Sequence, residues 1–284
     1  MPSSFSPLRY PGGKSQLYDY VKRIIDYNDL LGETYVEPFA GGAGLAMKLL
    51  LNNDVKRIII NDYDFAIYSI WYCILNYTDD FCDRIQQIDI SIEEHDRQRT
   101  IYNSGTTNIF DMGIAAFYLN RTNRSGVIKG GVIGGREQSG LYKIDARFNK
   151  DALIKKIRAI AKEKGRIVLY NLDAMDFLSN GVLDHYYKTF VNFDPPYVMK
   201  GSQLYKNAFS EQDHKDLYKL ISKCKRKWIV TYDICPLIRE LYKNHRGAEI
   251  DINYSASNSG KAREYIFFSN NLFLPEGIEL TNQS

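Results

Sequence analysis

The segment of residues 34–61 limits the possible folds of this chain more than any other. Residues 34–39 form a short run of β-type residues, and the glycine-rich string Ala-Gly-Gly-Ala-Gly follows at 40–44. A helical stretch, 45–51, comes next, and a second apolar run, 57–61, follows it. Strand, glycine turn, helix and strand in this order are typical of a βαβ unit with two buried parallel strands.

Further strand-like runs continue the pattern towards the carboxyl end. They are predicted at 166–170, 189–193, 227–231 and 264–268, and helical segments such as 213–223 and 236–243 separate several of them. This alternation favours a Rossmann-like α/β fold, in which one doubly wound sheet carries helices on both faces.

The middle of the chain departs from this pattern. From residue 100 to 150 the periodicity weakens, and glycines are concentrated at positions 126, 130, 131, 134, 135 and 140. Such a stretch is typical of loops rather than of a sheet core. For a chain of 284 residues we therefore predict two domains. Residues 1–77 and 151–284 would form a discontinuous core, and residues 78–150 a smaller, inserted, mainly helical and loop domain.

Composition argues against several classes of protein. The four cysteines form no C-x-x-C pair and the four histidines are scattered, so neither a metal site nor a disulfide framework is expected. The amino terminus lacks the layout of a signal peptide, and the longest apolar stretch, 66–75, is too short to span a membrane. We therefore expect a cytoplasmic protein without a membrane partner. The net charge of +3 neither indicates nor excludes a nucleic-acid partner.

The glycine turn at 40–44 is a candidate ligand site, because such a turn lets a ligand approach the backbone closely. Asp62 follows Gly41 by about 20 residues, the spacing at which a carboxylate binds ribose hydroxyls. The glycines do not fit the G-x-G-x-x-G pattern of dinucleotide sites. A ligand with an adenosine and a carboxylate therefore fits as well as a dinucleotide, and a role in helix–strand packing alone stays open.

The string Gly-Gly-Lys-Ser at 12–15 is not a phosphate-binding P-loop. That motif requires a glycine at the position of Leu8 and a strand before the loop, and the sequence provides neither. Lys14 is therefore either a solvated surface residue or a contact for a ligand carboxylate.

The strongest chemical signal is Asp194-Pro195-Pro196-Tyr197. It follows the apolar run 189–193, so it is expected at the carboxyl end of a central strand, where open α/β sheets bind ligands. The prolines fix the backbone and lack N–H donors. The Asp194 carboxylate and the neighbouring Pro195 carbonyl therefore form two adjacent hydrogen-bond acceptors.

Two adjacent acceptors match the two N–H donors of an exocyclic amine. The amine of adenine is a poor nucleophile because its lone pair is delocalised into the ring. Accepting both hydrogens localises that lone pair and stabilises the positive charge that develops on nitrogen. Tyr197 offers a face on which a base could stack, and a base in a duplex would have to be flipped out to reach the site. An ordinary Asp-Pro turn at a strand end is the alternative.

On these motifs the chain resembles the Dam-type (alpha-group) DNA adenine methyltransferases, which place their cofactor motif before their target-recognition domain. The resemblance covers essentially the whole chain. Residues 8–14 resemble the family's N-terminal cofactor loop, residues 37–42 its F-x-G-x-G turn, and residues 194–197 its D-P-P-Y motif. It implies a methyltransferase sheet, S-adenosylmethionine as cofactor, and methyl transfer to N6 of an adenine in double-stranded DNA.

The resemblance also implies roles for single residues. Those implied to bind the cofactor are Tyr10, Lys14, Glu37, Phe39, Ala40, Gly41, Asp62, Asp173 and Asp194. Asp62 would bind the ribose, and Asp173 would flank the adenine of the cofactor. The catalytic residues would be Asp194, Pro195, Pro196 and Tyr197. The chain departs from the family at Tyr10, where a tryptophan is usual, and at Ala43, the last glycine of F-x-G-x-G.

The middle region would then form the target-recognition domain. Its cations Arg121, Arg124, Lys129, Arg136, Lys143 and Arg147 outnumber its acids Glu137 and Asp145. Arg and Asn read base edges, and Lys and Arg anchor phosphates. We therefore predict DNA contacts for Asn120, Arg121, Asn123, Arg124, Lys129 and Arg136; the alternative is an exposed basic loop without a special role. Segment 200–207 is expected to form a mobile loop over the flipped base. Segment 255–261 is a further candidate for DNA contact and is equally well explained as a plain turn.

Other functions stay open. A related enzyme could methylate cytosine N4, an RNA adenine or a protein glutamine, but those sites typically resemble S-P-P-Y or N-P-P-Y, so Asp194 favours adenine. A catalytically idle DNA-binding relative is an alternative from another class. We expect a monomer or a weak dimer. The sequence defines neither the recognised DNA site nor whether a companion restriction endonuclease exists.

Overall fold

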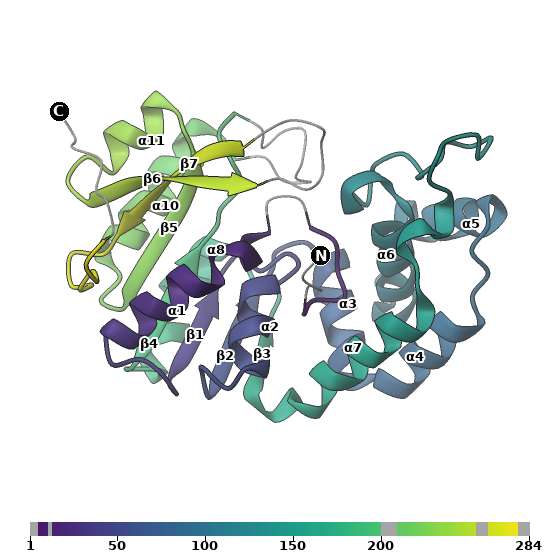
Figure 1. Ribbon diagram of the computed structural model, residues 1–284, viewed down its shortest axis with the longest axis horizontal. Coiled ribbons are helices and arrows are strands. Elements are labelled where there is room, and N and C mark those ends of the chain that lie inside the picture. The colour runs from purple at the N-terminus through teal and green to yellow at the C-terminus, as the bar shows by residue number, and fades with distance from the viewer. Residues whose placement is uncertain (1–4, 11–12, 200–208, 254–260, 278–284) are drawn as a thin grey trace.

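The computed structural model describes residues 5–10, 13–199, 209–253 and 261–277. Figure 1 shows an α/β part on the left beside a helical part on the right, with the amino-terminal segment running between them. In the part of the chain so described, no helix is both long enough and apolar enough to cross a membrane.

A seven-stranded sheet is the centre of the α/β part. Its strands are β1 (Thr34–Glu37), β2 (Arg57–Asn61), β3 (Ile167–Tyr170), β4 (Thr189–Phe193), β5 (Lys227–Asp233), β6 (Arg246–Asn253) and β7 (Lys261–Phe268). Their order is β3-β2-β1-β4-β5-β7-β6; β7 runs antiparallel to both of its neighbours, and the other pairs are parallel. The order reverses between β1 and β4, and such a switch point is where open α/β sheets bind ligands.

Successive residues of the strands point to opposite faces of the sheet, and both faces are covered. Tyr35, Ile58 and Ile60 belong to one buried cluster, whereas Val36 and Ile59 belong to the other. Helices on the first face include α1 (Tyr18–Tyr27), α2 (Gly44–Leu51) and α3 (Phe65–Asn76), and those on the second are α8 (Ala174–Ser179), α10 (Glu211–Lys223) and α11 (Pro236–Leu241). This arrangement confirms the predicted doubly wound α/β fold.

The helical part contains α4 (Thr78–Gln87), α5 (Ile92–Asn103) and α6 (Ile109–Thr122), followed by a glycine-rich loop and α7 (Lys150–Lys162). The weak periodicity expected from residue 100 onwards hides a regular helix, because α6 packs against α3, α4 and α5 and is buried on nearly all sides. A helix buried all round has no polar face and so no periodic pattern to detect. Strand β6 was also absent from the predicted runs. Helix α6 packs on α3, and α4 packs on α7, so helices of the predicted inserted domain contact helices of the predicted core. The domain borders at residues 77 and 151 therefore stay a prediction.

Asn61 connects the segments that follow β1 and β3 at the carboxyl ends of the parallel strands. Its buried Nδ2 donates hydrogen bonds to the Pro38 carbonyl (2.9 Å) and the Leu172 carbonyl (3.0 Å), and its Oδ1 accepts one from the Leu172 N–H (2.9 Å). One side chain at the end of β2 therefore holds the loops that leave β1 and β3.

Asn61→Ala should lower the free energy of unfolding by at least about 2 kcal/mol, because an unpaired buried polar group costs about 1–3 kcal/mol. Urea unfolding measures the change. Asn76→Ala removes an exposed side chain that bonds only its own helix, and it should stay within about 0.5 kcal/mol of the original protein. Equal effects of the two substitutions would contradict the role of Asn61.

Candidate active site

The glycine turn after β1 lies against Tyr10 and Asp62. Gly41 has a φ of 46°, and a Cβ added there would lie 2.6 Å from Tyr10 Cε1, so the Tyr10 ring packs directly on the backbone. The Gly41 N–H donates to Asp62 Oδ2 (2.7 Å), and Trp71 Nε1 donates to the Gly41 carbonyl (2.9 Å). The structure therefore brings together Tyr10, Gly41 and Asp62, which the sequence places in three separate segments.

The Asp62 carboxylate has room for further donors. Each of its oxygens accepts one backbone N–H, from Gly41 and from Asp64, and a carboxylate has about four lone-pair sites. Burial raises the pKa of Asp62 to about 7. Hydroxyl groups donated to this carboxylate would favour its ionised form.

Three more predicted cofactor residues have local structural roles as well. The Glu37 carboxylate accepts from the Tyr35 hydroxyl (3.0 Å) and from the Ala46 N–H at the start of α2 (3.2 Å), and burial raises its pKa to about 8. Asp173 caps α8 by accepting the Met175 N–H (2.8 Å).

Phe39 is the third predicted cofactor residue with a local structural role, after Glu37 and Asp173. Ala40 follows Phe39 in the glycine turn. The Phe39 ring contacts the Phe209 ring edge-on, with 6.1 Å between centroids. Ala40 is buried, and its N–H donates to the Asn61 carbonyl (2.9 Å). Both residues therefore lie at the same edge of the sheet as Asp62.

Asp194 lies at the same edge because β4 pairs with β1, with Thr189 opposite Thr34. Lys14 Nζ is 2.8 Å from Asp194 Oδ1, and the Thr231 hydroxyl donates to the same oxygen (3.0 Å). Within the described residues no hydrogen bond to Asp194 Oδ2 is found. One oxygen of the carboxylate is thus held by the protein while the other stays available.

Lys14 is not a solvated lysine, one of the two alternatives left by the sequence, since only 5% of it is exposed. Its ammonium also donates to the Tyr197 hydroxyl (2.7 Å) and lies 3.4 Å from Glu264 Oε2. Burial lowers the pKa of Lys14, but the charges of Asp194 and Glu264 outweigh burial and raise it. Burial raises the pKa of Asp194, against the opposing charge of Lys14.

Asp233 holds the residues that directly follow the segment 194–197. Its carboxylate accepts the Val198 N–H (3.0 Å) and the Met199 N–H (2.7 Å). Tyr197 is 4% exposed and its hydroxyl donates to Glu264. Sequence reasoning missed Glu264, Thr231 and Asp233. The available signal for Glu264 was a charged residue at the start of the predicted strand run 264–268, which has no other charged residue.

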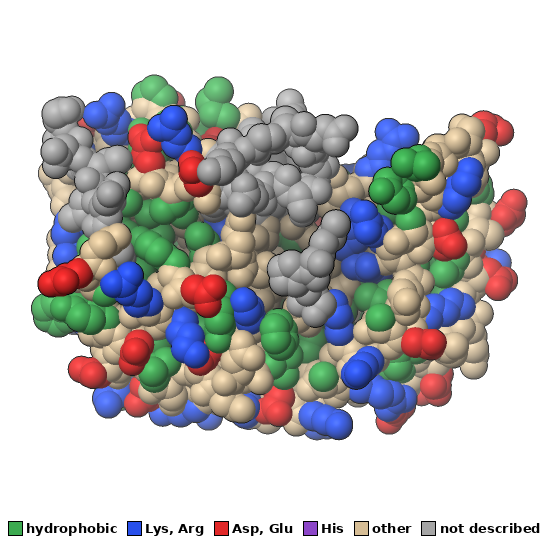
Figure 2. Space-filling view, in the orientation of Figure 1, with side chains coloured by type: hydrophobic (Ala, Val, Ile, Leu, Met, Phe, Trp, Pro, Cys, Tyr) green, Lys and Arg blue, Asp and Glu red, His purple; other side chains and the backbone are tan. Residues whose placement is uncertain are grey.

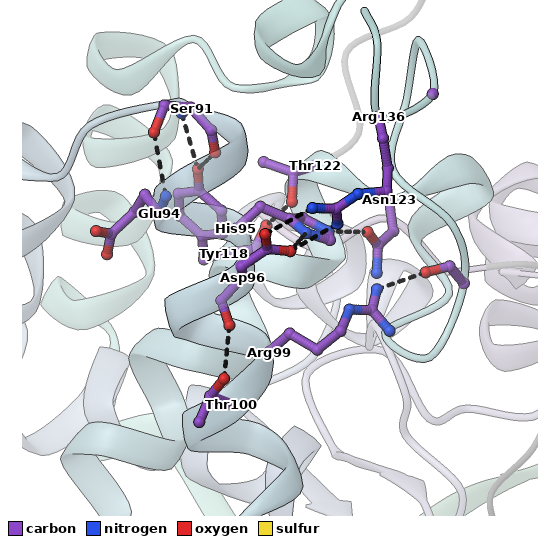
Figure 3. A network of polar contacts seen from close by, with 12 residues as sticks. Ser91, Glu94, His95, Asp96, Arg99, Thr100, Tyr118, Thr122, Asn123 and Arg136 are labelled. Atoms are coloured by element: carbon purple, nitrogen blue, oxygen red, sulfur yellow. Dashed lines mark hydrogen bonds and ion pairs between the residues drawn. The ribbon is translucent and has the colours of Figure 1, made fainter.

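The predicted DNA contacts differ in exposure. Arg124, Lys129 and Arg136 are exposed and Arg121 is half-buried, whereas Asn120 and Asn123 are 0% exposed. Figure 3 shows Asn123 between α5 and the glycine-rich loop: its Oδ1 faces His95 Nε2 (2.8 Å), and its Nδ2 donates to the carbonyls of Val127 and Ile128.

Arg136 belongs to the same network. It forms two hydrogen bonds to the Asp96 carboxylate, each 2.8 Å long (Figure 3). Arg99 donates to the Gly130 carbonyl (2.6 Å). In this arrangement Asn123 and Arg136 hold the glycine-rich loop that follows α6, and their direct contact with DNA stays a prediction.

Asn120 bonds to the amino-terminal segment. Its Oδ1 accepts the Arg9 N–H (2.9 Å), and its Nδ2 donates to the Arg9 carbonyl (2.7 Å) and the Gly126 carbonyl (2.9 Å). Arg9 precedes Tyr10, so the helical part holds the segment that covers the glycine turn.

The Asp194 carboxylate lies at the switch point of a doubly wound sheet, at the same edge as the glycine turn and the Asp62 carboxylate. A methyltransferase that acts on an amino group requires this arrangement: an acceptor for the amine next to a turn and a carboxylate that can bind the cofactor. More narrowly, the chain belongs to the D12 class N6 adenine-specific DNA methyltransferase family, whose model matches residues 10–255. It is an adenine-specific DNA methyltransferase that uses S-adenosylmethionine, as the resemblance of its motifs implied.

Two relatives span most of the chain. The Type II methyltransferase M.CviBI of Paramecium bursaria Chlorella virus NC1A is 23% identical over 258 residues, 87% of this chain and 90% of the relative. The Type II methyltransferase M.MjaIII of Methanocaldococcus jannaschii is 22% identical over 223 residues, 74% of each chain. A solved S-adenosylmethionine-dependent methyltransferase from Agrobacterium tumefaciens matches 90% of this chain and 61% of its own, at 11% identity and a TM-score of 0.40.

Asn120→Ala should raise the KM for S-adenosylmethionine about tenfold, because losing hydrogen bonds worth about 1.4 kcal/mol frees the segment that carries Tyr10. Steady-state kinetics at saturating DNA measure it. Asn108→Ala, which removes the N-cap of the same helix, is the control and should leave this KM unchanged. A normal KM with altered DNA affinity or site choice would instead support a DNA contact for Asn120.

Proposed function

We propose that this enzyme methylates N6 of an adenine flipped out of double-stranded DNA, with Asp194 and the Pro195 carbonyl accepting the two amine hydrogens. The observation that carries the proposal is the state of Asp194: Lys14 and Thr231 hold Oδ1, and Oδ2 has no protein donor among the described residues. An anchored carboxylate with one available oxygen is a preorganised acceptor for charge that develops on the amine.

S-adenosylmethionine supplies the methyl group as a sulfonium. The residues around the glycine turn fit this cofactor: Asp62 retains acceptor sites for ribose hydroxyls, and the backbone at Gly41 leaves no room for a side chain beside Tyr10. We assign cofactor contacts to Tyr10, Phe39, Ala40, Gly41, Asp62 and Asp173. Glu37 would support these contacts by accepting a hydrogen bond from the Ala46 N–H at the start of α2.

Asp194 and Pro195 would draw the amine hydrogens away from the ring and so expose the nitrogen lone pair. Lys14 favours the ionised form of Asp194, because its positive charge opposes burial, which raises the Asp194 pKa. The enzyme would also hold the target adenine and S-adenosylmethionine close together at the switch point, and this proximity would raise the rate of methyl transfer further. Pro196 and Tyr197 would fix the backbone conformation of residues 194–197. A base-stacking role for Tyr197 is also part of the proposal.

We place the DNA-binding surface on residues 78–150 and the adjoining amino-terminal segment. Arg121 Nε donates to the Arg147 carbonyl (2.7 Å), and Arg9 donates to the Asn123 carbonyl (2.9 Å), so these guanidinium groups bond to neutral oxygens. Burial and the charges of Arg9 and Arg147 lower the pKa of Arg121 to about 9. Figure 2 shows Lys and Arg side chains gathered where the helical part faces the α/β part. A polyanion such as the DNA backbone would relieve this repulsion.

The relatives' description as Type II methyltransferases supports a site-specific enzyme of that class. A cytoplasmic location, a monomer or weak dimer, and a companion restriction endonuclease as partner complete the proposal.

Asp194→Ala should reduce methyl transfer at least about 100-fold, the usual loss when one preorganised polar group is removed, while cofactor binding is retained. Transfer of labelled methyl groups to DNA and digestion to nucleosides measure both rate and product. Asp26→Ala, an exposed position on α1, should have the original activity. Full activity of Asp194→Ala, or label in N4-methylcytosine, would overturn the proposal.

Arg147→Ala should weaken binding of duplex DNA and reduce the slope of log affinity against log salt by about 1, because one phosphate contact is lost. Fluorescence anisotropy over a salt series measures the slope. Lys219→Ala, which breaks an ion pair with Asp216 on α10, should change neither quantity. An unchanged slope for Arg147→Ala would remove this residue from the DNA surface.

A further inference from the structure

Glu264 reaches the site from a strand that the D-P-P-Y motif does not include. The parallel strands end at the ligand-binding edge, but β7 runs the other way and therefore begins there. Glu264 is the fourth residue of β7, pairs with Asp233 at the end of β5, and is 1% exposed. The antiparallel strand thus delivers a buried carboxylate to the edge where the amine acceptors lie.

This carboxylate contacts two side chains that surround Asp194. Glu264 Oε1 accepts the Tyr197 hydroxyl, and Oε2 lies 3.4 Å from Lys14 Nζ. Lys14 in turn bonds to Asp194 Oδ1 (2.8 Å) and to the Tyr197 hydroxyl (2.7 Å). The four side chains form one buried network, in which three oxygen-bearing groups fix the direction of one ammonium.

Such a network is expensive to bury. Each charged group loses its hydration, and a buried ion pair is often no more stable than an apolar replacement of the same shape. Stability therefore does not explain the arrangement, whereas holding Asp194 in one orientation does.

We propose that Glu264 is a positioning residue for methyl transfer, which holds Lys14 and Tyr197 so that Asp194 presents its second oxygen to the amine. This inference rests on the proposed role of Asp194. Glu264 acts on the reaction only through its two neighbours. Its loss therefore affects the rate of transfer rather than the binding of either substrate.

Kinetics of Glu264→Gln and Glu264→Ala test this role. Glu264→Ala should lower kcat about 100-fold, the loss typical of an active group displaced by about 1 Å, with the KM for S-adenosylmethionine within about twofold of the original. Glu264→Gln still accepts from Tyr197 and should recover part of the rate, about tenfold below the original. Glu249→Gln, on the neighbouring strand β6 and paired with Arg263, is the matched control and should be fully active.

A double-mutant cycle with Tyr197→Phe gives a second test. If Glu264 works through Tyr197, the losses from Glu264→Gln and Tyr197→Phe should not add. Full kcat in Glu264→Ala would overturn the inference, and so would a loss that appears only in the KM for S-adenosylmethionine. If Glu264→Ala fails to fold by circular dichroism, Glu264→Asp decides instead: a shorter carboxylate should lower kcat, and full activity would overturn the inference. Inactivity of the original enzyme would instead refute the proposed function.

Discussion

The ion pair between the buried Lys14 and the partly buried Asp194 is the interaction on which the rest of the site depends. It joins the amino-terminal segment to the end of β4, two parts of the chain separated by most of the α/β core. Lys14 is 5% exposed, so both partners have lost hydration that their mutual attraction must offset. The pair favours the ionised form of the carboxylate and fixes which of its oxygens faces the protein. This orientation is the basis of the acceptor role that we propose for Asp194.

The same amino-terminal segment links the two halves of the molecule. Tyr10 packs on the glycine turn, and the residue before it, Arg9, bonds through its backbone to Asn120 at the end of α6. The glycine-rich loop after α6 is held in turn by Asn123 and by the Arg136–Asp96 pair (Figure 3). Elements that we assign to cofactor binding and elements that we assign to DNA binding are therefore joined by hydrogen bonds.

Sequence reasoning worked where neighbours in the chain are also neighbours in space. The βαβ unit, the glycine turn and the corner at 194–197 are local patterns, and each lies where the patterns predict. It failed at α6, because a helix buried on every side lacks the polar stripe that reveals a helix. It also assigned Asn120 by residue type alone. The preference of asparagine for base edges cannot be distinguished in a sequence from its preference for backbone groups.

The sequence by itself determined the βαβ unit, the alternation of strands and helices after it, the family, and the chemistry of the catalytic string, because periodicity and turn residues act over a few positions. Only the tertiary structure decided which charges meet. Glu264 lies 67 residues from its partner Tyr197, and Asn120 lies 111 residues from Arg9. Nothing in the intervening residues specifies either contact. Both arise from strand order and from the packing of α6, and these follow from burying apolar surface over the whole chain at once.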